Sequence, residues 1–525
     1  INGAFAFGLP IPIFGTCLKP VVNLSLSPNR AVNNTKTTIE DYDADGYPDI
    51  VRQEDECTLQ IRRSKIKRTN KLKTVITPLG AEYTVDYKLA PSNYDMPNSK
   101  WVVSKLDVYD PYATTAEGPS TMNKKFEFHN GRYDRRERDF YGFEYVRTID
   151  LQNDNSVYRQ NIDRYHNMSY YLNGMLKENY VVKGDITVHQ DVLKRDSITI
   201  SNSNKYSQLS NNYVLRAPIV STSTPWIIDT SSNLGEDYDV GGTKGNGAAY
   251  AQKVESTTTI YEFGSTTLSN TESMEYDEYG RVTNYAKAGS GNDYTSSITY
   301  QTPNFTKNLL LIPDQISVSD GSGLLRKRKV GSYDSNTGVI TSIHTYTSAG
   351  SYFTTSLSYY SNGNLNTVTT PIDQDGYSKI TEYTYDTTQQ QFITGISNTY
   401  NGEVYSSSAE YDLKFGVMTL STDITGNEMT YTYDPKGRVL QIKGPKDPTY
   451  SLKFAYTLNA SGKSFATTDH YDVQNPSNDL QTLTIVNGLG HPVQIKKDIV
   501  KYDNGTFDEG VSISGIVTKD KFGRA

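Results

Sequence analysis

A tyrosine that precedes a turn recurs at a fixed spacing in the second half of the chain. Tyr333, Tyr359, Tyr385 and Tyr411 start successive copies, each 26 residues after the one before. A fixed period in this range indicates a repeat array, in which each unit stacks on its neighbours to bury its apolar face. A unit of this length has room for about two to three short strands. The spacing therefore predicts one continuous sheet of stacked hairpins.

Two copies of the repeat are complete enough to suggest a role for each position. They read Tyr276-Asp-Glu-Tyr-Gly-Arg-Val282 and Tyr433-Asp-Pro-Lys-Gly-Arg-Val439. We expect the tyrosine to end a strand, the aspartate to accept backbone hydrogen bonds in the turn, and the glycine to supply a positive φ. The arginine, Arg281 or Arg438, is expected to lie along the surface or to pair with the aspartate of a neighbouring turn.

Alternation of apolar and polar residues extends along most of the chain, and no long segment has helical spacing. Leu452, Phe454 and Tyr456, for example, fall on one face of a single run. Tyrosine is unusually frequent, with 42 Tyr against 16 Phe and 2 Trp. Its apolar ring and polar tip suit a half-buried sheet face. The expected fold class is all-β, with many short strands.

Charge and hydropathy argue against two kinds of partner. The net charge of −7 and the pI of about 5.6 give no general attraction to nucleic acid or anionic lipid. A membrane helix needs roughly 18 apolar residues. The most apolar stretch, residues 4–14, is interrupted by Gly8, Pro10 and Pro12. We therefore expect no nucleic-acid partner and no membrane span.

The strongest candidate site is an acidic loop at residues 41–49, Asp-Tyr-Asp-Ala-Asp-Gly-Tyr-Pro-Asp. Calcium prefers six to eight oxygen ligands. Carboxylates at alternate positions of a tight turn can point inward together, and Gly46 permits the sharp bend. The predicted Ca²⁺ ligands are the side chains of Asp41, Asp43, Asp45 and Asp49 and the backbone carbonyl of Tyr47.

This loop is not an EF-hand, because position 12 is Arg52 where an EF-hand needs a bidentate glutamate. It resembles the FG-GAP/VCBS type, in which such a loop lies between strands of a β-propeller blade and a strand follows it. The resemblance implies a structural calcium ion and a propeller-type segment. The alternative is a solvated acidic turn without metal.

The middle of the chain carries a series of motifs in a recognisable order. They are Pro78-Leu-Gly80 before Tyr83, then Trp101-Val-Val103, then Arg136-Glu-Arg-Asp-Phe-Tyr-Gly-Phe143. The series resembles the B component of bacterial insecticidal toxin complexes. The charged cluster at residues 135–139 is expected to form cross-strand ion pairs, not a catalytic site.

From residue 255 to the end, the repeats resemble the YD-repeat or Rhs-repeat family. In that family a strip of hairpins spirals into a large hollow shell. The shell encloses a C-terminal polypeptide, often a toxin. The resemblance implies that this chain is an internal piece of a longer protein and that its repeats are truncated at residue 525.

These observations divide the chain into four segments. Residues 1–60 are expected to form the calcium-loop segment at the end of a propeller, and residues 61–235 a β-rich middle domain. Glycines cluster within residues 236–254, which are expected to be a linker. Residues 255–525 are expected to hold the repeats.

The expected function is structural, that of a shell wall in a secreted bacterial toxin or effector delivery protein. The expected partners are its own C-terminal cargo and secretion or toxin-complex subunits. The alternative is a cell-surface or wall-associated adhesin that binds glycans through exposed tyrosines. The sequence has no G-x-S-x-G or H-E-x-x-H motif and its six histidines are scattered, so we expect no enzyme. Cys17 and Cys57 could form a disulfide or remain free thiols.

Overall fold

A computed structural model gives the fold. It describes residues 6–7, 22–23, 37–43, 45–53, 58–66, 70–114, 118–152, 154–190, 195–219, 227–236, 238, 247–262, 266–289, 293–347, 350–459, 461–503, 506–515, 518 and 520. Cys17 and Cys57 lie outside the described residues, so both alternatives, a disulfide and two free thiols, remain predictions.

Strands make up nearly all of the regular structure. The first are β1 (Ala6–Phe7), β2 (Val22–Asn23), β3 (Thr37–Glu40), β4 (Asp49–Gln53) and β5 (Leu59–Arg62). The middle of the chain holds β6 (Thr74–Ile76), β7 (Glu82–Ala90), β8 (Lys100–Tyr109), β9 (Thr121–Asp134), β10 (Asp139–Leu151), β11 (Val157–Tyr165), β12 (Leu176–Lys183), β13 (Thr187–His189), β14 (Ser197–Thr199), β15 (Lys205–Arg216), β16 (Pro218–Ile219) and β17 (Ile227–Ile228).

The remaining strands form the second half of the chain. They are β18 (Tyr250–Glu262), β19 (Thr266–Tyr276), β20 (Val282–Gly289), β21 (Tyr294–Tyr300), β22 (Pro313–Asp320), β23 (Gly323–Tyr333), β24 (Ile340–Tyr346), β25 (Tyr352–Tyr359), β26 (Leu365–Thr369), β27 (Ile380–Tyr385), β28 (Ile393–Tyr400), β29 (Glu403–Asp412), β30 (Val417–Thr422), β31 (Glu428–Tyr433), β32 (Val439–Lys443), β33 (Leu452–Thr457), β34 (Ser464–His470), β35 (Leu480–Val486), β36 (Pro492–Asp503) and β37 (Thr506–Ser514).

Within the described residues, the helical segments are two 3-10 turns, η1 (Asn202–Asn204) and η2 (Phe305–Lys307). Neither is long or apolar enough to cross a membrane as a helix. The predicted all-β class is confirmed.

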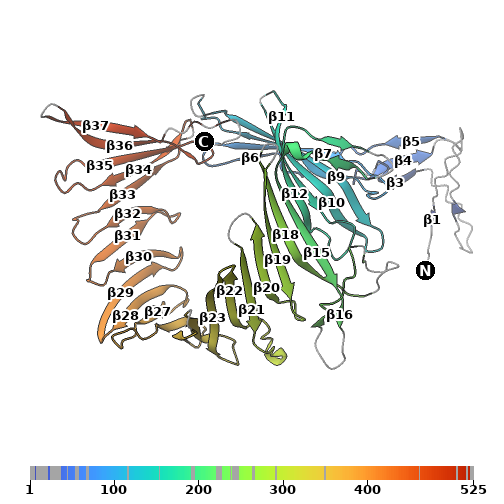
Figure 1. The fold of residues 1–525 in the computed structure, drawn as a ribbon. Helices are drawn as coiled ribbons and strands as arrows, with labels where there is room; N and C mark the ends of the chain where they lie inside the picture. Colours follow the sequence, from blue (N-terminus) through green and yellow to red (C-terminus); the bar gives the residue numbers. More distant parts are fainter. Residues whose placement is uncertain are drawn as a thin grey trace, which may run out of the picture.

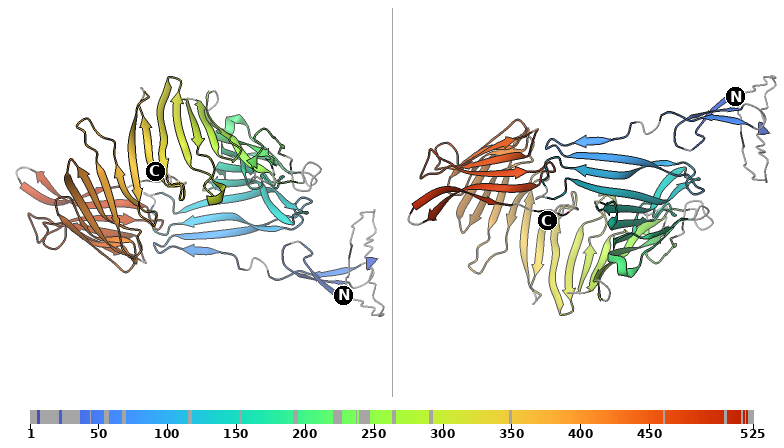
Figure 2. Two further views of the ribbon diagram at one scale, coloured as in Figure 1. Left: turned by 90° about the horizontal axis from the view of Figure 1, so that it is seen from below. Right: turned by 90° about the horizontal axis from the view of Figure 1, so that it is seen from above.

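One antiparallel sheet contains β6–β12, β15 and β18–β37, and its strand order closes on itself. Strands that follow one another in this sheet pair side by side; β27 and β28, for example, align Ile380 with Thr399. Figure 2 shows the sheet end-on as a ring, in which the red strands of the C-terminal end come round to the blue start. The separate sheet β3-β4-β5 lies outside this ring (Figure 1).

The wall of the ring is largely a single layer of strands. In β33 burial alternates residue by residue, with Leu452, Phe454 and Tyr456 partly buried and their neighbours exposed. The accessible surface of the chain is 33,864 Å², whereas the scaling for compact monomers gives about 19,000 Å² at this mass. A sheet with solvent on both faces contributes to this excess, and it suits tyrosine, whose ring is apolar and whose tip is polar.

Each 26-residue repeat contains two strands, one hairpin, at the lower end of the expected range. Between Tyr333 and Tyr359, for instance, lie β24 and β25. The turn geometry is as expected: Asp277 Oδ1 accepts hydrogen bonds from the N–H of Tyr279 (2.9 Å) and of Arg281 (3.0 Å).

The predicted pairing of the repeat arginines with a neighbouring turn is wrong. Arg281 Nε donates to Asp277 Oδ2 (2.7 Å) and Arg438 Nε to Asp434 Oδ2 (2.6 Å), both within one turn. The positive φ of the turn glycine folds the chain back and brings the guanidinium onto its own aspartate. The guanidinium of Arg281 also stacks on the Tyr300 ring, at 4.4 Å from its centroid.

A second layer covers the sheet in the middle region. The hairpin β13–β14 places Ile198 against a buried cluster that contains Tyr145, Ile162 and Val182. The connection between β15 and β18 contributes Tyr238 to a second cluster with Leu172 and Leu215. Most of the fully buried side chains of the described residues lie in this region, so it is the most solid part of the wall.

The main sheet runs without a break past the predicted glycine-rich linker. β15 pairs directly with β18, from Ser207↔Ile260 to Arg216↔Tyr250. The last residues of the predicted linker, 250–254, belong to β18. The four-segment division stays a prediction.

The charged cluster at residues 135–139 lies mainly in a hairpin turn. Residues 135–138 connect β9 to β10, and Arg138 has a positive φ of 57°. Arg135 stacks on the Tyr94 ring and donates to the Tyr94 carbonyl (3.0 Å). The expected cross-strand ion pairs are therefore wrong, because residues 135–138 lie in the turn and Asp139, at the start of β10, faces Asp134, which carries the same charge.

Two hairpin tips meet where the ring comes round to its start. The turn between β35 and β36 approaches the turn between β6 and β7 and also the connection between β8 and β9, which contains Asp110. Gly488 N–H donates to Asp110 Oδ1 (3.1 Å), and Thr77 Oγ1 donates to the Gly488 carbonyl (3.3 Å). Asp110 and Ala81 are almost fully buried there. We call Thr77, Ala81, Asp110 and Gly488 the junction.

Candidate functional site

The acidic loop connects β3 to β4 in the small sheet outside the ring (Figure 1). Its oxygens are brought together as the spacing predicts. One carboxylate oxygen from each of Asp41, Asp43 and Asp49 lies within 4.8 Å of the others. Asp49 is only 1% exposed because it begins the central strand of this sheet.

Backbone hydrogen bonds hold the loop carboxylates in place. Asp41 accepts the N–H of Asp45 (2.9 Å) and of Gly46 (2.8 Å). Asp49 accepts the N–H of Tyr42 (3.2 Å) and of Ser64 (2.7 Å).

Two of the predicted ligands stand apart from this cluster. Asp45 is not part of the group of three close carboxylates, and its Oδ1 accepts the N–H of Tyr47 (2.9 Å). The contacts of the described residues do not show whether the Tyr47 carbonyl faces the cluster, so its role as a ligand stays a prediction.

The chemistry of the loop fits a hard cation. Asp43 Oδ1 is buried without a hydrogen-bond partner among the described residues, which is costly for a carboxylate oxygen. The only cation paired with the cluster among those residues is Arg63, 3.5 Å from Asp43 Oδ2 and largely exposed. Three carboxylates against one exposed cation leave negative charge that a calcium ion would balance. The metal assignment itself stays a prediction.

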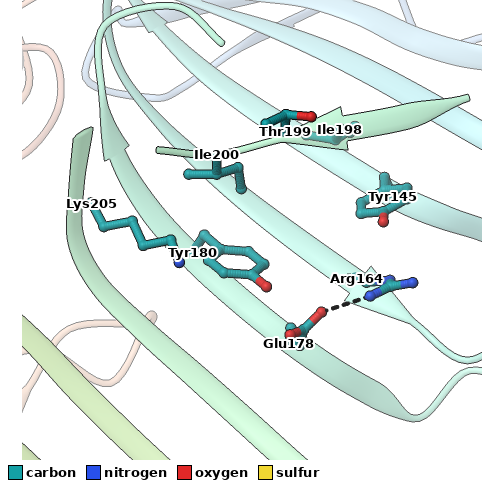
Figure 3. A pocket seen from close by; sticks show the side chains of 8 residues that line it. All are labelled: Tyr145, Arg164, Glu178, Tyr180, Ile198, Thr199, Ile200 and Lys205. Carbon is teal, nitrogen blue, oxygen red and sulfur yellow. Dashed lines mark hydrogen bonds and ion pairs between the residues drawn. The ribbon is translucent and has the colours of Figure 1, made fainter. Parts of the chain in front are cut away.

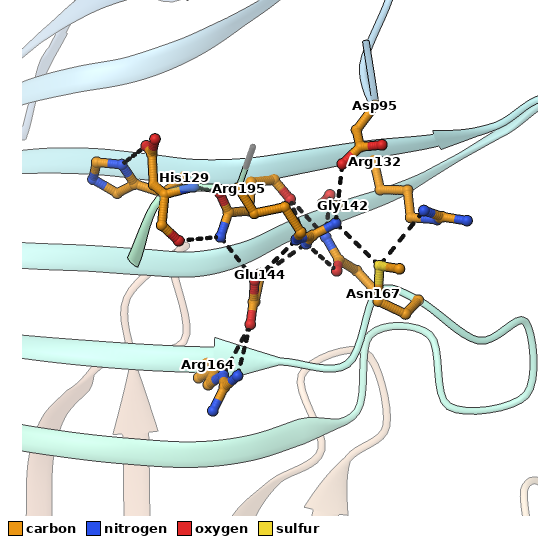
Figure 4. Close-up of polar contacts among 11 residues, drawn as sticks. Asp95, His129, Arg132, Gly142, Glu144, Arg164, Asn167 and Arg195 are labelled. Carbon is orange, nitrogen blue, oxygen red and sulfur yellow. Dashed lines mark hydrogen bonds and ion pairs between the residues drawn. The ribbon is translucent and has the colours of Figure 1, made fainter. Parts of the chain in front are cut away.

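A second polar constellation, in the middle region, was missed from the sequence (Figure 4). Arg195 donates to Asn167 Oδ1 (2.8 Å) and Glu144 Oε2 (3.1 Å). Arg164 donates to the other Glu144 oxygen (3.0 Å) and to Glu178 Oε2 (2.9 Å). These contacts join β10, β11 and β12 to the segment that leads into β14.

A buried histidine continues this network. His129 Nδ1 lies 2.9 Å from Asp196 Oδ2, and its other nitrogen lies 3.7 Å from Glu127. The nearby imidazole of His129 holds the pKa of Glu127 well below its usual range, and Lys125 and Arg147 add to the effect against the opposing cost of burial. His166 is buried as well, in the connection that follows β11.

Arg147 is the most buried cation of the network, at 4% exposure. It donates to Gln160 Oε1 through Nε (3.0 Å) and Nη2 (2.6 Å), and it pairs with Glu127. Gln160 in turn donates to the Gly184 carbonyl (2.7 Å). Arg147, Arg164 and Arg195 each pair with a carboxylate, which favours a structural role: the network fastens the β13–β14 hairpin to the sheet.

Few features of the sequence point to this network. Its members are single polar residues on separate strands, and only the register of four strands brings them together. The one available signal is the placement of charged residues at alternate positions of predicted strands, such as Glu127 with His129.

Comparisons with known proteins agree with this architecture. Residues 22–174 match a protein family described as the insecticide toxin TcdB middle/N-terminal region. No curated protein matches the sequence.

Several solved structures have the same fold at low sequence identity. The crystal structure of TcdB2-TccC3 aligns with a TM-score of 0.63 and 11% identity over 96% of this chain and 34% of that chain. The same complex without its hypervariable C-terminal region gives 0.62 and 10%, over 93% and 37%. The Photorhabdus luminescens Tc holotoxin pore gives 0.61 and 10%, over 94% and 34%. The present chain thus spans about a third of the length of these proteins and shares their β-shell fold.

Proposed function

We propose that this chain is part of the wall of a hollow toxin-complex-type β-shell that encloses a polypeptide cargo. The observation that carries the proposal is the closed, mostly single-layered antiparallel sheet. A wall of this kind separates an inside from an outside, whereas a solid domain of the same length would bury far more surface. The role is structural rather than catalytic.

The comparisons support the toxin-complex part of this proposal. The family match covers residues 22–174, and the similar solved structures are complexes of TcdB2 with TccC3 and a Tc holotoxin. By analogy, the cargo would be a C-terminal polypeptide of the same or an associated chain, and other toxin-complex subunits would be partners. A secreted location follows from the same analogy. The repeats from residue 255 onward are proposed to be YD/Rhs repeats.

Small-angle scattering with negative-stain images of the purified chain tests the shell. A compact protein of 525 residues has a radius of gyration of about 24 Å. We expect a clearly larger value, and end-on particles that look like a ring with a stain-filled centre. A radius near the compact value together with solid particles would overturn the proposal.

We also propose that the loop at residues 41–49 binds one structural calcium ion through Asp41, Asp43 and Asp49, with Asp45 and the Tyr47 carbonyl as further candidates. The buried, unpartnered Asp43 oxygen supports this assignment. The ion would fasten β3 to β4 and so stiffen the small sheet.

The calcium proposal predicts that Asp49→Asn abolishes calcium binding. In the wild-type chain, calcium at a hundredfold excess over its Kd should stabilise the loop by about 2.7 kcal/mol. Bound calcium per chain, measured by elemental mass spectrometry after dialysis, and the thermal midpoint with calcium or with chelator are the readouts. Asp375→Asn, in an exposed turn, is the control. Equal calcium content in both variants would contradict the assignment.

A further inference from the structure

A half-open cavity of about 290 Å³ lies on β10–β12, beneath the β13–β14 hairpin (Figure 3). Its lining comes from separate elements, with Tyr145 from β10, Arg164 from β11, Tyr180 from β12 and Lys205 from β15. The volume is at the lower end of the range of small-molecule sites and has room for one ring-sized ligand.

Apolar groups form two sides of this cavity, and polar groups line the rest. The rings of Tyr145 and Tyr180 form its floor, and Ile198 and Ile200 cover it from the hairpin side (Figure 3). The hydroxyl of Tyr180 points toward the middle of the space in this view. Such walls suit the C–H face of a saturated ring, with hydroxyl groups placed at the edge to set its orientation.

The two cations that line the cavity, Arg164 and Lys205, differ in whether they form ion pairs. Arg164 is fully engaged, because it pairs with Glu178 in the cavity and with Glu144 behind it. Lys205 makes no ion pair within the described part of the chain. Its ammonium donates to Gln208 Oε1 (2.9 Å) and lies over the rings of Tyr180 (5.1 Å) and Tyr261 (5.4 Å). Burial lowers the pKa of Lys205, and the nearby carboxylate of Glu178 opposes this shift.

We propose that this cavity binds an acidic monosaccharide unit, a pyranose ring with one carboxylate. The carboxylate would form a direct ion pair with the Lys205 ammonium, which Glu178 influences without pairing with it. The C–H face of the ring would rest on the tyrosines, and its hydroxyls would bond to the Tyr180 hydroxyl and Glu178. The inference does not depend on enclosure of a cargo, since it concerns a site built by four neighbouring strands of the wall and the β13–β14 hairpin that covers them.

Titration of the intact chain with glucuronic acid tests this site, with glucose as the neutral probe of the same shape. We expect saturable binding of glucuronic acid, at least about tenfold tighter than that of glucose, because a charge-assisted hydrogen bond is worth a tenfold factor or more. Calorimetry or saturation-transfer NMR gives the dissociation constants. Inorganic phosphate serves as a competitor that carries charge without a ring.

Four variants separate the contributions. Lys205→Met should weaken glucuronic acid binding about tenfold or more, whereas Lys205→Arg should retain it. Ile198→Trp fills the cavity without changing charge and should abolish binding. Lys327→Met is the matched control, because Lys327 also lies over a tyrosine ring, that of Tyr346, but far from the cavity in the sheet order. Thermal midpoints of all variants report whether they fold.

Several results would overturn the proposal. They are no saturable binding of glucuronic acid in the millimolar range, equal affinity for glucose, phosphate binding as tight as that of the sugar acid, or unchanged affinity in Ile198→Trp. Should Lys205→Met fail to fold, the comparison of the two sugars on the wild-type chain and the cavity-filling variant still decide the outcome.

Discussion

Tyrosine hydroxyls repeat one contact along the sheet. Each lies near the end of its strand and donates to a backbone carbonyl of the preceding strand. Tyr276 bonds to the Lys253 carbonyl at 2.7 Å. The same contact is made by the pairs Tyr300–Val282, Tyr359–Ile340, Tyr385–Leu365, Tyr433–Met418 and Tyr456–Val439. Phenylalanine could fill the same space but would leave these carbonyls without this partner, which explains why tyrosine dominates.

Replacement of one such tyrosine should have a modest and specific cost. Tyr276→Phe removes the hydroxyl that bonds to Lys253 and should lower the free energy of unfolding by about 1 kcal/mol. Denaturant titration followed by tyrosine fluorescence measures the change. Tyr405→Phe is the control, since Tyr405 is 48% exposed and its hydroxyl makes no hydrogen bond to the described residues. Equal effects of the two variants would contradict the argument.

His166 gives the chain an acid-sensitive point. Burial lowers its pKa, the nearby Lys177 adds to the effect, and Glu236 opposes it. The folded chain therefore keeps this imidazole neutral while the unfolded chain takes up a proton below about pH 6.5. Because the unfolded state binds more protons there, stability must fall as the pH falls through this range.

The corresponding variant should lose part of that pH dependence. In His166→Phe the group no longer titrates, so its thermal midpoint should fall less than that of the wild-type chain between about pH 6.5 and pH 5. His189→Phe, at an exposed position, should keep the wild-type profile. A His166→Phe profile parallel to the wild type would show that other groups set the acid response.

At the scale of elements, the polar network fastens a small hairpin to the wall. Arg147→Met would leave Glu127 and Gln160 without their buried partner. We expect a loss of about 3–5 kcal/mol in the free energy of unfolding, as for other broken buried ion pairs. Arg326→Met, on an exposed strand position, should change stability little. Differential scanning calorimetry compares the two.

The repeat hairpins could be predicted from the sequence, whereas the network could not. The Tyr-Asp…Gly-Arg turns follow from local rules: an aspartate that accepts nearby N–H groups and a glycine with positive φ, such as Gly437 at 78°. Even so, the partner predicted for Arg281 was wrong. The choice between the aspartate of its own turn and that of a neighbouring turn depends on how the hairpin turn folds.

Long-range placement was the harder part of the problem. Three of the acidic-loop carboxylates come together as their spacing suggests, and that spacing is local. The contact of Arg195 with Asn167 and Glu144 depends on strand order and on a hairpin folded over the sheet, neither of which any short motif encodes. The cavity beneath that hairpin escaped prediction for the same reason.

At the scale of the whole molecule, the junction closes the ring through very few groups. A Cβ on Gly488 would lie 2.7 Å from Asp110 Oδ1 and 3.1 Å from the Ala81 nitrogen, so a side chain there must push the two tips apart. Few other described contacts link the two ends of the sheet. Closure therefore depends on the absence of a side chain at one position.

Gly488→Val should open the ring without unfolding the hairpins. We expect an increased radius of gyration by small-angle scattering and unchanged β content by circular dichroism. Gly321→Val is the control, because a Cβ at Gly321 meets nothing within 4 Å. If both variants kept the wild-type scattering profile, the junction would not be what holds the two ends together.

The two-strand repeat also has a consequence for how such walls change size. Each hairpin is hydrogen-bonded mainly to the hairpins on either side of it in the sheet. Insertion or loss of a whole 26-residue copy, such as residues 359–384, leaves each side chain of the remaining strands on its original face of the sheet. Only the circumference of the ring changes. A single-residue insertion within a strand would instead move the side chains that follow it to the opposite face of the sheet. Related proteins should therefore differ in enclosed volume by whole hairpin repeats.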